Sequence, residues 1–460
     1  MPDPRFASLA AAAPAVIVRA TMKRDTVDLT SHARERGTDP KLRVGAMAGA
    51  LIGSEILKIA GDIRALVAGG REICNLTVGD FDPKQFPIPE RLKTGIVEAL
   101  EKGETNYPPS DGLPVLRKAV AEFYARELGL SYPMESVLIA GGARPLLYGI
   151  YRTVLDRGDK VVYPVPSWNN NHYVHLSDTI GVPVACTREH MFLPTEDELA
   201  PVLGDARLLS LNSPLNPTGT AIPAERLRAI CALVLEENQK RERRGARPLY
   251  LMYDHIYWML CARGVEHVTP PALNPEMARY TIFVDGISKA FAATGVRVGW
   301  GVGPVDVMER MSAVLGHVGA WAPRAEQVAT AKLLADVDGI REYHAKFQPA
   351  VESRLRALAD GLGALKSKGL EVDCLPPMGG IYLTARLHAL GRKTPAGATL
   401  TKSEEIRKYL LEAAGFAIVP FSAFGVQSDE GWFRLSVGAV SLPEIAAALP
   451  RVEKALAALR

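Results

Sequence analysis

Between about residues 137 and 302, short apolar runs alternate with stretches whose apolar residues recur at helical spacing. The runs are VLIAGG, KVVYPV, VPVAC, RLLSLN, LYLMYD, TIFVDG and VGWGVG. Helical patterns at 145–156 and 223–240 lie between them. A strand followed by a helix and another strand is the repeating unit of a mostly parallel sheet covered by helices. The sequence therefore predicts an α/β fold built on such a sheet.

The rest of the chain predicts a second, smaller α+β domain. At 460 residues the chain is longer than one domain usually is. Its C-terminal part mixes short strands (YLTARL, FAIVP, WFRLSV) with helical patterns. We expect an N-terminal arm over 1–42, a small domain formed by 43–75 and 340–460, and a large domain over 76–339.

Composition excludes several classes of protein. Hydrophobic residues make up 48% and charged residues 23%, with a net charge of +3, so neither nucleic acid nor an anionic membrane is an expected partner. No apolar run reaches the roughly 18 residues of a transmembrane helix, and Pro14 interrupts the apolar segment 9–18, which favours an arm over a signal peptide. The five cysteines and nine histidines form no CxxC, HxxxH or HExxH pattern. We therefore expect no metal site and a reducing cytoplasm.

The strongest chemical signal is Gly286-Ile287-Ser288-Lys289, directly after an apolar strand. A lysine there lies at the carboxyl edge of the sheet, where open α/β folds bind ligands. Its amine, if deprotonated, can form an imine with an aldehyde cofactor. Arg297, eight residues on, is a fixed cation suited to a phosphate. A surface lysine and a salt-bridging arginine are the alternative.

Two further strand ends carry polar residues that suit a pyridine ring. Asp254 ends LYLMYD and Tyr257 follows three residues later. A buried carboxylate facing a pyridine nitrogen keeps it protonated, so that the ring withdraws electrons. A phenol near the ring hydroxyl would lower the pKa of an imine, and Asn216, in the turn NSPLNPTG, could present its amide to the same oxygen. The alternatives are an aspartate that caps the next helix and an ordinary turn.

Three more positions suit a phosphate, a flat ring and a carboxylate. Gly142 and Ala143, between a strand and a helix, would let backbone N–H groups approach a phosphate. Trp168 could stack on a cofactor ring, although a lone tryptophan is more often a core residue. Arg434 lies in the apolar strand GWFRL and would fit a carboxylate with its planar fork. The alternative for Arg434 is an ion pair with the two acids just before that strand.

Taken together, these motifs resemble the class I/II PLP-dependent aminotransferases, the aspartate-aminotransferase-like enzymes of fold type I. Their order along the chain is Gly-Asp-Phe (79–81), Asn106-Tyr107 before Gly112, GGA, the stacking aromatic, NPTG, D-x-x-Y, SK with G-x-R-x-G, and the late arginine. The resemblance extends from about Asn75 to Arg434. It implies an amino group moved between an L-amino acid and a 2-oxo acid by ping-pong chemistry, with pyridoxal 5′-phosphate (PLP) as cofactor, in a cytoplasmic homodimer with sites at its interface.

The resemblance also implies roles for individual residues. Lys289 would hold PLP as an imine and carry the proton, while Asp254 and Tyr257 would act on its ring. The residues expected to bind the cofactor are Gly142, Ala143, Trp168, Asn216, Asp254, Tyr257, Ser288, Lys289 and Arg297, with Tyr107 reaching the phosphate of the partner subunit. The residues expected to bind the substrate are Gly79, Asn216 and Arg434.

The sequence departs from the family pattern at several positions. Gly286 stands where a phosphate-binding Ser or Thr is usual, His255 replaces a common acid, and Phe421 replaces a glycine. Arg144-Pro145 stand where a Gln-Ala type pair is commoner. All of these lie near the expected site, so the departures bear on substrate choice.

We expect one substrate to be a dicarboxylate, aspartate or glutamate/2-oxoglutarate. Arg434 would take the α-carboxylate, and donors for the second carboxylate could come from the polar cluster 169–172, His255 or Arg144. A neutral or aromatic amino acid is the alternative. Another PLP reaction of the same fold, such as β-elimination, decarboxylation or oxidation, would use the same motifs. A non-catalytic regulator would need a DNA-binding domain, for which the roughly 40 residues before the first helix are too few.

Overall fold

The computed structural model describes residues 26, 28–34, 43–51 and 55–460, in two units, 1–50 and 51–460. The first unit contains two short helices, α1 (Thr30–Arg34) and α2 (Ala46–Ala50). The apolar segment 9–18 and most of the expected arm lie outside the described residues. The second unit begins with α3 (Glu55–Ala68) and contains every expected site residue.

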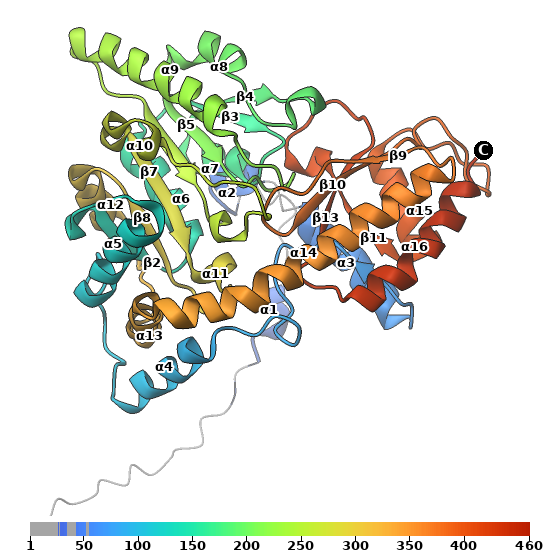
Figure 1. The fold of residues 1–460 in the computed structure, drawn as a ribbon, viewed down its shortest axis with the longest axis horizontal. Helices are drawn as coiled ribbons and strands as arrows, with labels where there is room; N and C mark the ends of the chain where they lie inside the picture. Colours follow the sequence, from blue (N-terminus) through green and yellow to red (C-terminus); the bar gives the residue numbers. More distant parts are fainter. Residues whose placement is uncertain (1–25, 27, 35–42, 52–54) are drawn as a thin grey trace, which may run out of the picture. The chain divides into compact units, whose positions relative to one another are not determined.

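A seven-stranded sheet forms the centre of the second unit. From one edge to the other its strands are β2 (Val137–Ala140), β8 (Gly299–Val302), β7 (Thr281–Gly286), β6 (Tyr250–Asp254), β5 (Ala206–Asn212), β3 (Lys160–Val165) and β4 (Ile180–Ala185) (Figure 1). Strand β8 runs antiparallel to its neighbours β2 and β7, and the other pairs are parallel. Each strand coincides with one of the apolar runs in the sequence. The predicted mostly parallel α/β sheet is confirmed.

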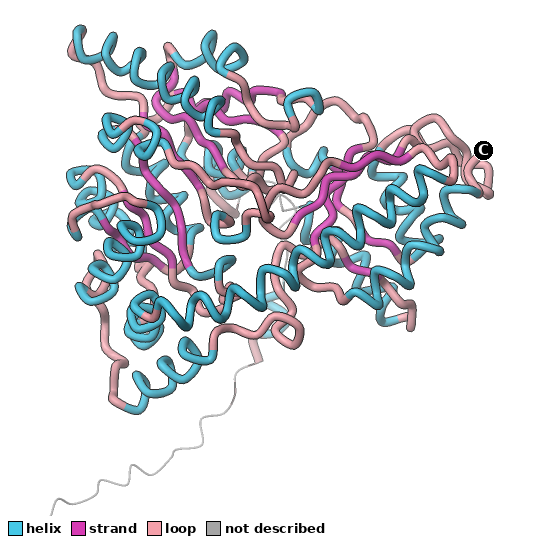
Figure 2. The backbone as a smooth tube through the Cα atoms, in the orientation of Figure 1, coloured by secondary structure: helices cyan, strands magenta, loops and turns pink. Residues whose placement is uncertain are grey.

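Helices bury both faces of this sheet, which is why its strands are apolar throughout. In β2, Val137 and Ile139 pack into one core, whereas Leu138 and Ala140 pack into the core on the opposite face. Figure 2 shows the strands lying between the helices. The first core is lined by α4 (Glu90–Glu101), α5 (Pro114–Leu128), α8 (Glu196–Leu203), α9 (Ala224–Arg243) and α13 (Arg324–Ala335). The second is lined by α6 (Ala143–Val154), α7 (Asn170–Ser177) and α12 (Val305–Val318). Two short helices, α10 (Pro270–Leu273) and α11 (Ile287–Ala290), follow β6 and β7.

A second, four-stranded antiparallel sheet has its own core. Its strand order is β12 (Val419–Pro420), β13 (Trp432–Ser436), β10 (Tyr382–Leu387) and β9 (Val372–Cys374). This core includes side chains of α14 (Val337–Ser367), α15 (Ser403–Ala414) and α16 (Leu442–Ala457). A short parallel pair joins β1 (Cys74–Asn75) to β11 (Phe416–Ala417). Residues 51–460 form one compact unit by their contacts, so the limits of a large and a small domain stay a prediction.

The junction between α13 and α14 differs from the sequence pattern, which predicts one helix over 324–367. Asp336 interrupts it, because its side chain accepts a hydrogen bond from the N–H of Gly339 at 3.1 Å and caps a new helix. Among the described residues, no helix is both long and apolar enough to cross a membrane.

The core beneath the second sheet gives a stability prediction. Leu358 of α14 is fully buried, so Leu358→Ala should lower the free energy of unfolding by about 2–5 kcal/mol through lost burial and a cavity. Urea unfolding of the apoprotein, followed by tryptophan fluorescence, measures this. Arg356→Ala, at an exposed position of the same helix, is the control and should change it by less than about 0.5 kcal/mol. Equal effects of the two changes would contradict the packing described here.

Candidate active site

Three neighbouring parallel strands end at one edge of the seven-stranded sheet, and the candidate site is built on these ends. Asn212 ends β5, Asp254 ends β6 and Gly286 ends β7, followed at once by α11 with Lys289. The strands are in register there, with Asn212 opposite Asp254, and the Asn212 side chain donates to the Asp254 carbonyl at 2.8 Å. Carboxyl ends of parallel strands are where open α/β sheets bind ligands. The motifs are far apart along the chain, but the parallel strands bring them close together in space.

The amine of Lys289 lies against the loop that contains the Gly-Asp-Phe motif. Its Nζ donates a hydrogen bond to the carbonyl of Gly79 at 2.5 Å. The rings of Phe81 and Tyr257 each lie with their centroids 5.9 Å from Nζ. Lys289 is therefore a partly buried side chain pointing into the site, and the alternative of a surface lysine does not describe it.

The surroundings of Lys289 favour its neutral form. Burial lowers the pKa of Lys289 to about 8, and the carboxylate of Asp80 acts in the opposite direction. Three guanidinium groups lower the pKa further, those of Arg434, Arg144 and Arg297. A neutral amine is both the nucleophile that forms an imine and a base that can accept a proton. The electrostatics thus suit the role that the sequence indicates.

Asp254 has a carboxylate that resists ionisation. Burial raises the pKa of Asp254 to about 7, against smaller opposing effects of the Ile256 N–H and the charge of Lys289. Its carboxylate accepts from that N–H at 3.1 Å, within a tight turn. The next helical turn begins at Trp258, and its capping residue is Tyr257, so Asp254 does not cap it. A buried carboxylate of this kind is suited to a strong hydrogen bond with a protonated ring nitrogen.

Tyr257 is joined to a second tyrosine that the sequence did not single out. The hydroxyls of Tyr257 and Tyr382 are 2.8 Å apart, and burial raises the pKa of both phenols, most strongly that of Tyr257. Tyr382 begins β10, and its ring lies 4.8 Å from the guanidinium carbon of Arg434. The sequence feature that could have pointed to Tyr382 is the glycine pair 379–380 just before this strand. These glycines let the backbone approach the ring of Tyr257 closely. Tyr382 therefore belongs to the site although no motif named it.

The turn before α6 forms a cradle for an anion. Gly142 precedes the helix at φ 95°, and a Cβ there would overlap the guanidinium of Arg297. That guanidinium donates to the carbonyls of Thr294 at 2.6 Å and Gly141 at 2.8 Å, and Arg297 itself adopts φ 63°. Free N–H groups at the start of a helix beside a fixed cation suit a phosphate. Only glycine fits position 142.

Gly286 stands where the family usually has a serine or threonine, and the reason for the glycine is steric. A Cβ at Gly286 would lie 2.7 Å from the Cα of Gly299 and 2.8 Å from the Val298 carbonyl oxygen, both backbone atoms. Gly299 is in turn packed so closely against Gly142 that its own Cβ would lie 2.7 Å from the carbonyl carbon of that residue. A serine or threonine at 286 would therefore push the adjacent strand and the cradle apart. The neighbour of Lys289 on α11, Ser288, is buried.

Arg434 forms the opposite end of the site. It is 1% exposed, and it donates to the Asn216 side chain at 3.1 Å and to the Thr77 carbonyl at 2.6 Å. The rings of Tyr382 and Phe424 lie 4.8 and 4.9 Å from its guanidinium carbon. Its Nε–H has no acceptor among the described residues. A buried cation with an unused N–H is suited to binding a carboxylate.

The acids before β13 are engaged elsewhere, so the alternative of an ion pair for Arg434 does not hold. Asp429 accepts from the backbone and hydroxyl of Ser403, and Glu430 lies 3.7 Å from Arg386. Gly79 lies between Arg434 and Lys289, because a Cβ there would be 3.8 Å from the Arg434 Nη1 while its carbonyl accepts from Lys289. The structure thus brings together Gly79, Asn216, Tyr257, Lys289 and Arg434.

Three further positions named from the sequence have the following surroundings. The Trp168 side chain is partly buried. The centroid of its ring lies 4.7 Å from the guanidinium carbon of Arg144. Tyr107 is 81% exposed and packs edge-on against Trp321 at 5.3 Å. Phe421 packs into an aromatic cluster rather than the site.

Two residues considered as donors for a second carboxylate are occupied. Asn170 accepts from Tyr151 at 3.0 Å and from Ser210 at 2.9 Å, and it donates to Ser167. His255 is fully buried, with its ring nitrogens 2.8 Å from the Tyr124 hydroxyl and 3.3 Å from a nitrogen of His267. Burial lowers the pKa of His255 well below its usual range. The expectation is therefore corrected for Asn170 and for His255, since neither side chain is available to a substrate; it stays a prediction for the other members of the cluster 169–172.

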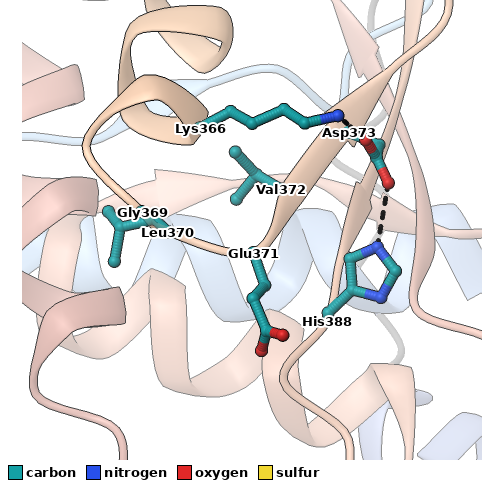
Figure 3. A pocket seen from close by; sticks show the side chains of 7 residues that line it. All are labelled: Lys366, Gly369, Leu370, Glu371, Val372, Asp373 and His388. Atoms are coloured by element: carbon teal, nitrogen blue, oxygen red, sulfur yellow. Dashed lines mark hydrogen bonds and ion pairs between the residues drawn. The ribbon is translucent and has the colours of Figure 1, made fainter.

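A hollow elsewhere on the surface does not carry this chemistry. It is lined by Lys366 of α14, residues 369–373 and His388 just after β10, and Asp373 pairs there with Lys366 and His388 (Figure 3). Asp373 accepts from Lys366 at 2.6 Å and lies 3.0 Å from the Nε2 of His388. The charge of Asp373 is thereby neutralised within the hollow, in contrast to the arginines around Lys289.

The residues around Lys289 fit one kind of cofactor. A neutral amine suits an aldehyde, the cradle at Gly142 suits a phosphate, and Asp254 suits a pyridine nitrogen. The unused N–H of Arg434 adds a place for the carboxylate of an amino acid. This combination defines the site of a PLP-dependent enzyme that acts on amino acids.

Comparisons with known proteins agree with this geometry. Residues 71–452 match the family "Aminotransferase class I and II". The aspartate aminotransferase of Rhizobium meliloti (strain 1021) is 31% identical over 93% of this chain and 98% of its own length. The crystal structure of aspartate aminotransferase from Rhizobium meliloti superimposes with a TM-score of 0.82, covering 91% of this chain and 99% of that one.

Two further solved structures extend the comparison. Thermus thermophilus aspartate aminotransferase with maleate has a TM-score of 0.79 at 28% identity, covering 92% of this chain and 100% of that one. An aromatic aminotransferase from Pyrococcus horikoshii OT3 has a TM-score of 0.75 at 27% identity, covering 86% and 98%.

The chain belongs to the class I and II aminotransferases. It is a PLP-dependent transaminase of fold type I, as the sequence motifs predicted.

The lowered pKa of Lys289 gives a pH prediction. Only the neutral amine forms an imine, so the rate at which the apoenzyme recombines with PLP should rise with pH and level off above about 8. Asp80→Asn removes the negative charge that raises this pKa, so its rate should level off at a lower pH. The measurement is borohydride-trapped PLP on the protein against time.

Two controls accompany this measurement. Asp338→Asn, at a side chain that is 98% exposed, should leave the profile unchanged. Lys289→Ala should give no trapped product at any pH. Trapped PLP in that variant would assign the cofactor to a different lysine.

Proposed function

We propose that this transaminase acts on dicarboxylic substrates, with aspartate or glutamate/2-oxoglutarate as the leading pair. The observation that carries the amino-acid part of the proposal is the position of Gly79 between the amine of Lys289 and the guanidinium of Arg434. An amino acid whose α-carboxylate pairs with Arg434 brings its Cα toward the base on Lys289. Relatives named aspartate aminotransferases, and the Thermus thermophilus structure with maleate, a dicarboxylate, support the substrate class.

We propose the following roles for the chain's own residues. Gly142, Ala143, Ser288 and Arg297 hold the phosphate end of PLP, Trp168 stacks on its ring, and Asn216 and Tyr257 contact its ring hydroxyl. When bound, PLP supplies an aldehyde and an electron-withdrawing protonated ring. Asp254 keeps a proton on the ring nitrogen by ion pairing. The Nζ of Lys289 takes the proton from the substrate Cα, because its pKa, lowered to about 8, leaves a large fraction of the amine neutral at that pH. Tyr382 orients the Tyr257 hydroxyl through their hydrogen bond.

One specific observation favours a second substrate class. Arg434 lies between the rings of Tyr382 and Phe424, and Trp168 is close by, so apolar surface is available beside the carboxylate. The similarity to an aromatic aminotransferase agrees with that alternative. Other PLP outcomes, such as β-elimination, decarboxylation or oxidation, would use the same groups.

A half-reaction separates these substrate classes. The pyridoxamine phosphate form of the enzyme is mixed separately with 2-oxoglutarate, oxaloacetate, pyruvate and phenylpyruvate, and recovery of the visible cofactor band is followed. At least one dicarboxylate should react roughly tenfold more efficiently than either monocarboxylate, a difference of about 1.4 kcal/mol in the barrier. The opposite order would overturn the proposed substrate class. Failure of all four to react would overturn a transamination that uses these acceptors.

We also propose a homodimer with shared sites, in the cytoplasm. Tyr107 supports the dimer, since a large aromatic side chain that is 81% exposed in one chain is suited to burial against a second. The resemblance assigns it to the phosphate of the partner subunit. All five cysteines are free, which supports a reducing compartment.

Subunit mixing tests the shared site. Lys289→Ala and Tyr107→Ala homodimers should each have low activity, but mixed dimers contain one intact site. Random reassembly should then recover about a quarter of the wild-type activity, because half of the dimers are mixed and each has one working site of two. Mixing Lys289→Ala with Asp254→Ala is the control, because both changes affect the same chain's site, and it should recover nothing. No recovery in the first mixture would place Tyr107 in its own chain's site, and a fully active Tyr107→Ala homodimer would place it outside the site.

A further inference from the structure

Arg144 is a cation in an unfavourable position within its own helix. It is the second residue of α6, beside the Gly142 turn, and no acid lies in the first turn of this helix. The N-terminus of a helix is the positive end of its dipole, so a guanidinium there is destabilising unless an anion is close. Its guanidinium carbon lies 4.7 Å from the ring centroid of Trp168.

The electrostatic surroundings of Arg144 are positive. Its charge contributes to lowering the pKa of Lys289, of Arg297 and of His172, although burial is the largest cause in each case. It makes no hydrogen bond or ion pair with any residue in the described part of the chain, and its contact there is the ring of Trp168. Like charges in one site repel each other unless anions bind between them. Arg144 is therefore an exposed guanidinium, held against Trp168 beside the site and open to an anion from outside the described part of the chain.

Two of the three arginines around Lys289 are already assigned an anion, one from the cofactor and one from the substrate. Arg297 is fixed at the Gly142 cradle by two carbonyl groups, which suits a phosphate. Arg434 is fixed by Asn216 and Thr77, with an unused N–H for an α-carboxylate. A dicarboxylic substrate brings one more negative charge than these two groups accept. Arg144 is the remaining guanidinium.

We propose that Arg144, placed against the indole of Trp168, binds the distal carboxylate of the dicarboxylic substrate within the same chain. The proposal rests on the proposed function, because it presupposes a dicarboxylate. Two of the other donors considered for this carboxylate, Asn170 and His255, are taken up by internal hydrogen bonds. The contact with a flat aromatic face restricts the guanidinium while leaving its N–H groups at the edge free to bind oxygen.

The competing role for Arg144 is a second contact to the cofactor phosphate. The geometry favours the substrate role, because the guanidinium of Arg297 already fills the space at Gly142 that a Cβ would occupy. Arg144 instead lies against Trp168, which belongs to the ring side of the proposed site. The two roles differ in what they predict. A phosphate contact would affect PLP retention and all substrates alike, whereas a distal-carboxylate contact would affect dicarboxylates alone.

The experiment compares ligand binding by PLP-loaded Arg144→Gln, Arg144→Lys and wild-type enzyme. The ligands are maleate, a dicarboxylate that cannot be transaminated, and 3-phenylpropionate, a monocarboxylate, each titrated by calorimetry. The dissociation constant of PLP is measured separately on the apoenzymes. Arg152→Gln is the control, since Arg152 is exposed at the far end of the same helix.

Arg144→Gln should weaken maleate binding about 30-fold, equivalent to about 2 kcal/mol, as loss of a charge-assisted pair implies. Binding of 3-phenylpropionate and of PLP should change by less than about threefold, or about 0.7 kcal/mol. Arg144→Lys should lie in between, because it keeps the charge without the planar fork. Arg152→Gln should match the wild type.

Three outcomes would overturn the inference. Weakening of both acids alike would assign Arg144 to the α-carboxylate, a loss of PLP affinity would assign it to the phosphate, and an unchanged preference for maleate would remove it from the site. Failure of the proposed function looks different. In that case the wild-type enzyme itself would bind maleate no better than 3-phenylpropionate, and the oxo-acid half-reactions would favour monocarboxylates.

Discussion

The parallel pairing of β5, β6 and β7 is the constraint on which the site depends. Because parallel strands in register end at one edge, Asn212, Asp254 and Gly286 lie side by side although they are far apart in the sequence. The NPTG turn, the cofactor acid and Lys289 follow from these ends. Helices on both faces keep the central strands buried, so the ends of β5, β6 and β7 are fixed by two cores rather than one. The precision that a catalytic site needs thus comes from rigid strands and not from mobile loops.

At this edge of the sheet, positive charges outnumber negative ones, which suits the binding of an anionic cofactor and substrate. Three arginines act on Lys289, and Asp80 is the acid that opposes them. Of these arginines, Arg434 is buried, Arg297 is partly buried and Arg144 is exposed. Burial of Arg434 is costly without an anion, because its charge gives up its hydration. A cofactor phosphate and the carboxylates of a substrate would supply the missing negative charge. Burial is the main reason that the pKa of Lys289 is lowered to about 8, and the same arginines lower it further. One arrangement therefore supports both anion binding and proton transfer.

Close backbone contacts connect the two sheets at the site. Gly219 of the NPTG turn accepts hydrogen bonds through its carbonyl from the N–H groups of Met378 and Gly379, just before β10. Tyr382, the first residue of that strand, then reaches Tyr257 and lies beside Arg434. A Cβ at Gly219 would overlap the carbonyl of Tyr382, so only glycine permits this approach. The groups proposed for the cofactor and for the substrate carboxylate are in this way held in one fixed arrangement.

The sequence by itself determined the sheet, the family and most of the candidate residues. Apolar runs bounded by turns define buried strands, and the residues just beyond them occupy the edge where ligands bind, which places Lys289, Asp254 and Asn216 by local pattern alone. Tertiary structure decided what depends on contacts between distant segments. It placed the hydroxyl of Tyr382 against that of Tyr257 and left no space for a side chain at Gly286. It also engaged Asn170 and His255 in hydrogen bonds within the protein, and it packed Arg144 against Trp168. The physical reason is that burial and pairing of polar groups arise only when separate elements pack, and no local periodicity encodes which partners meet.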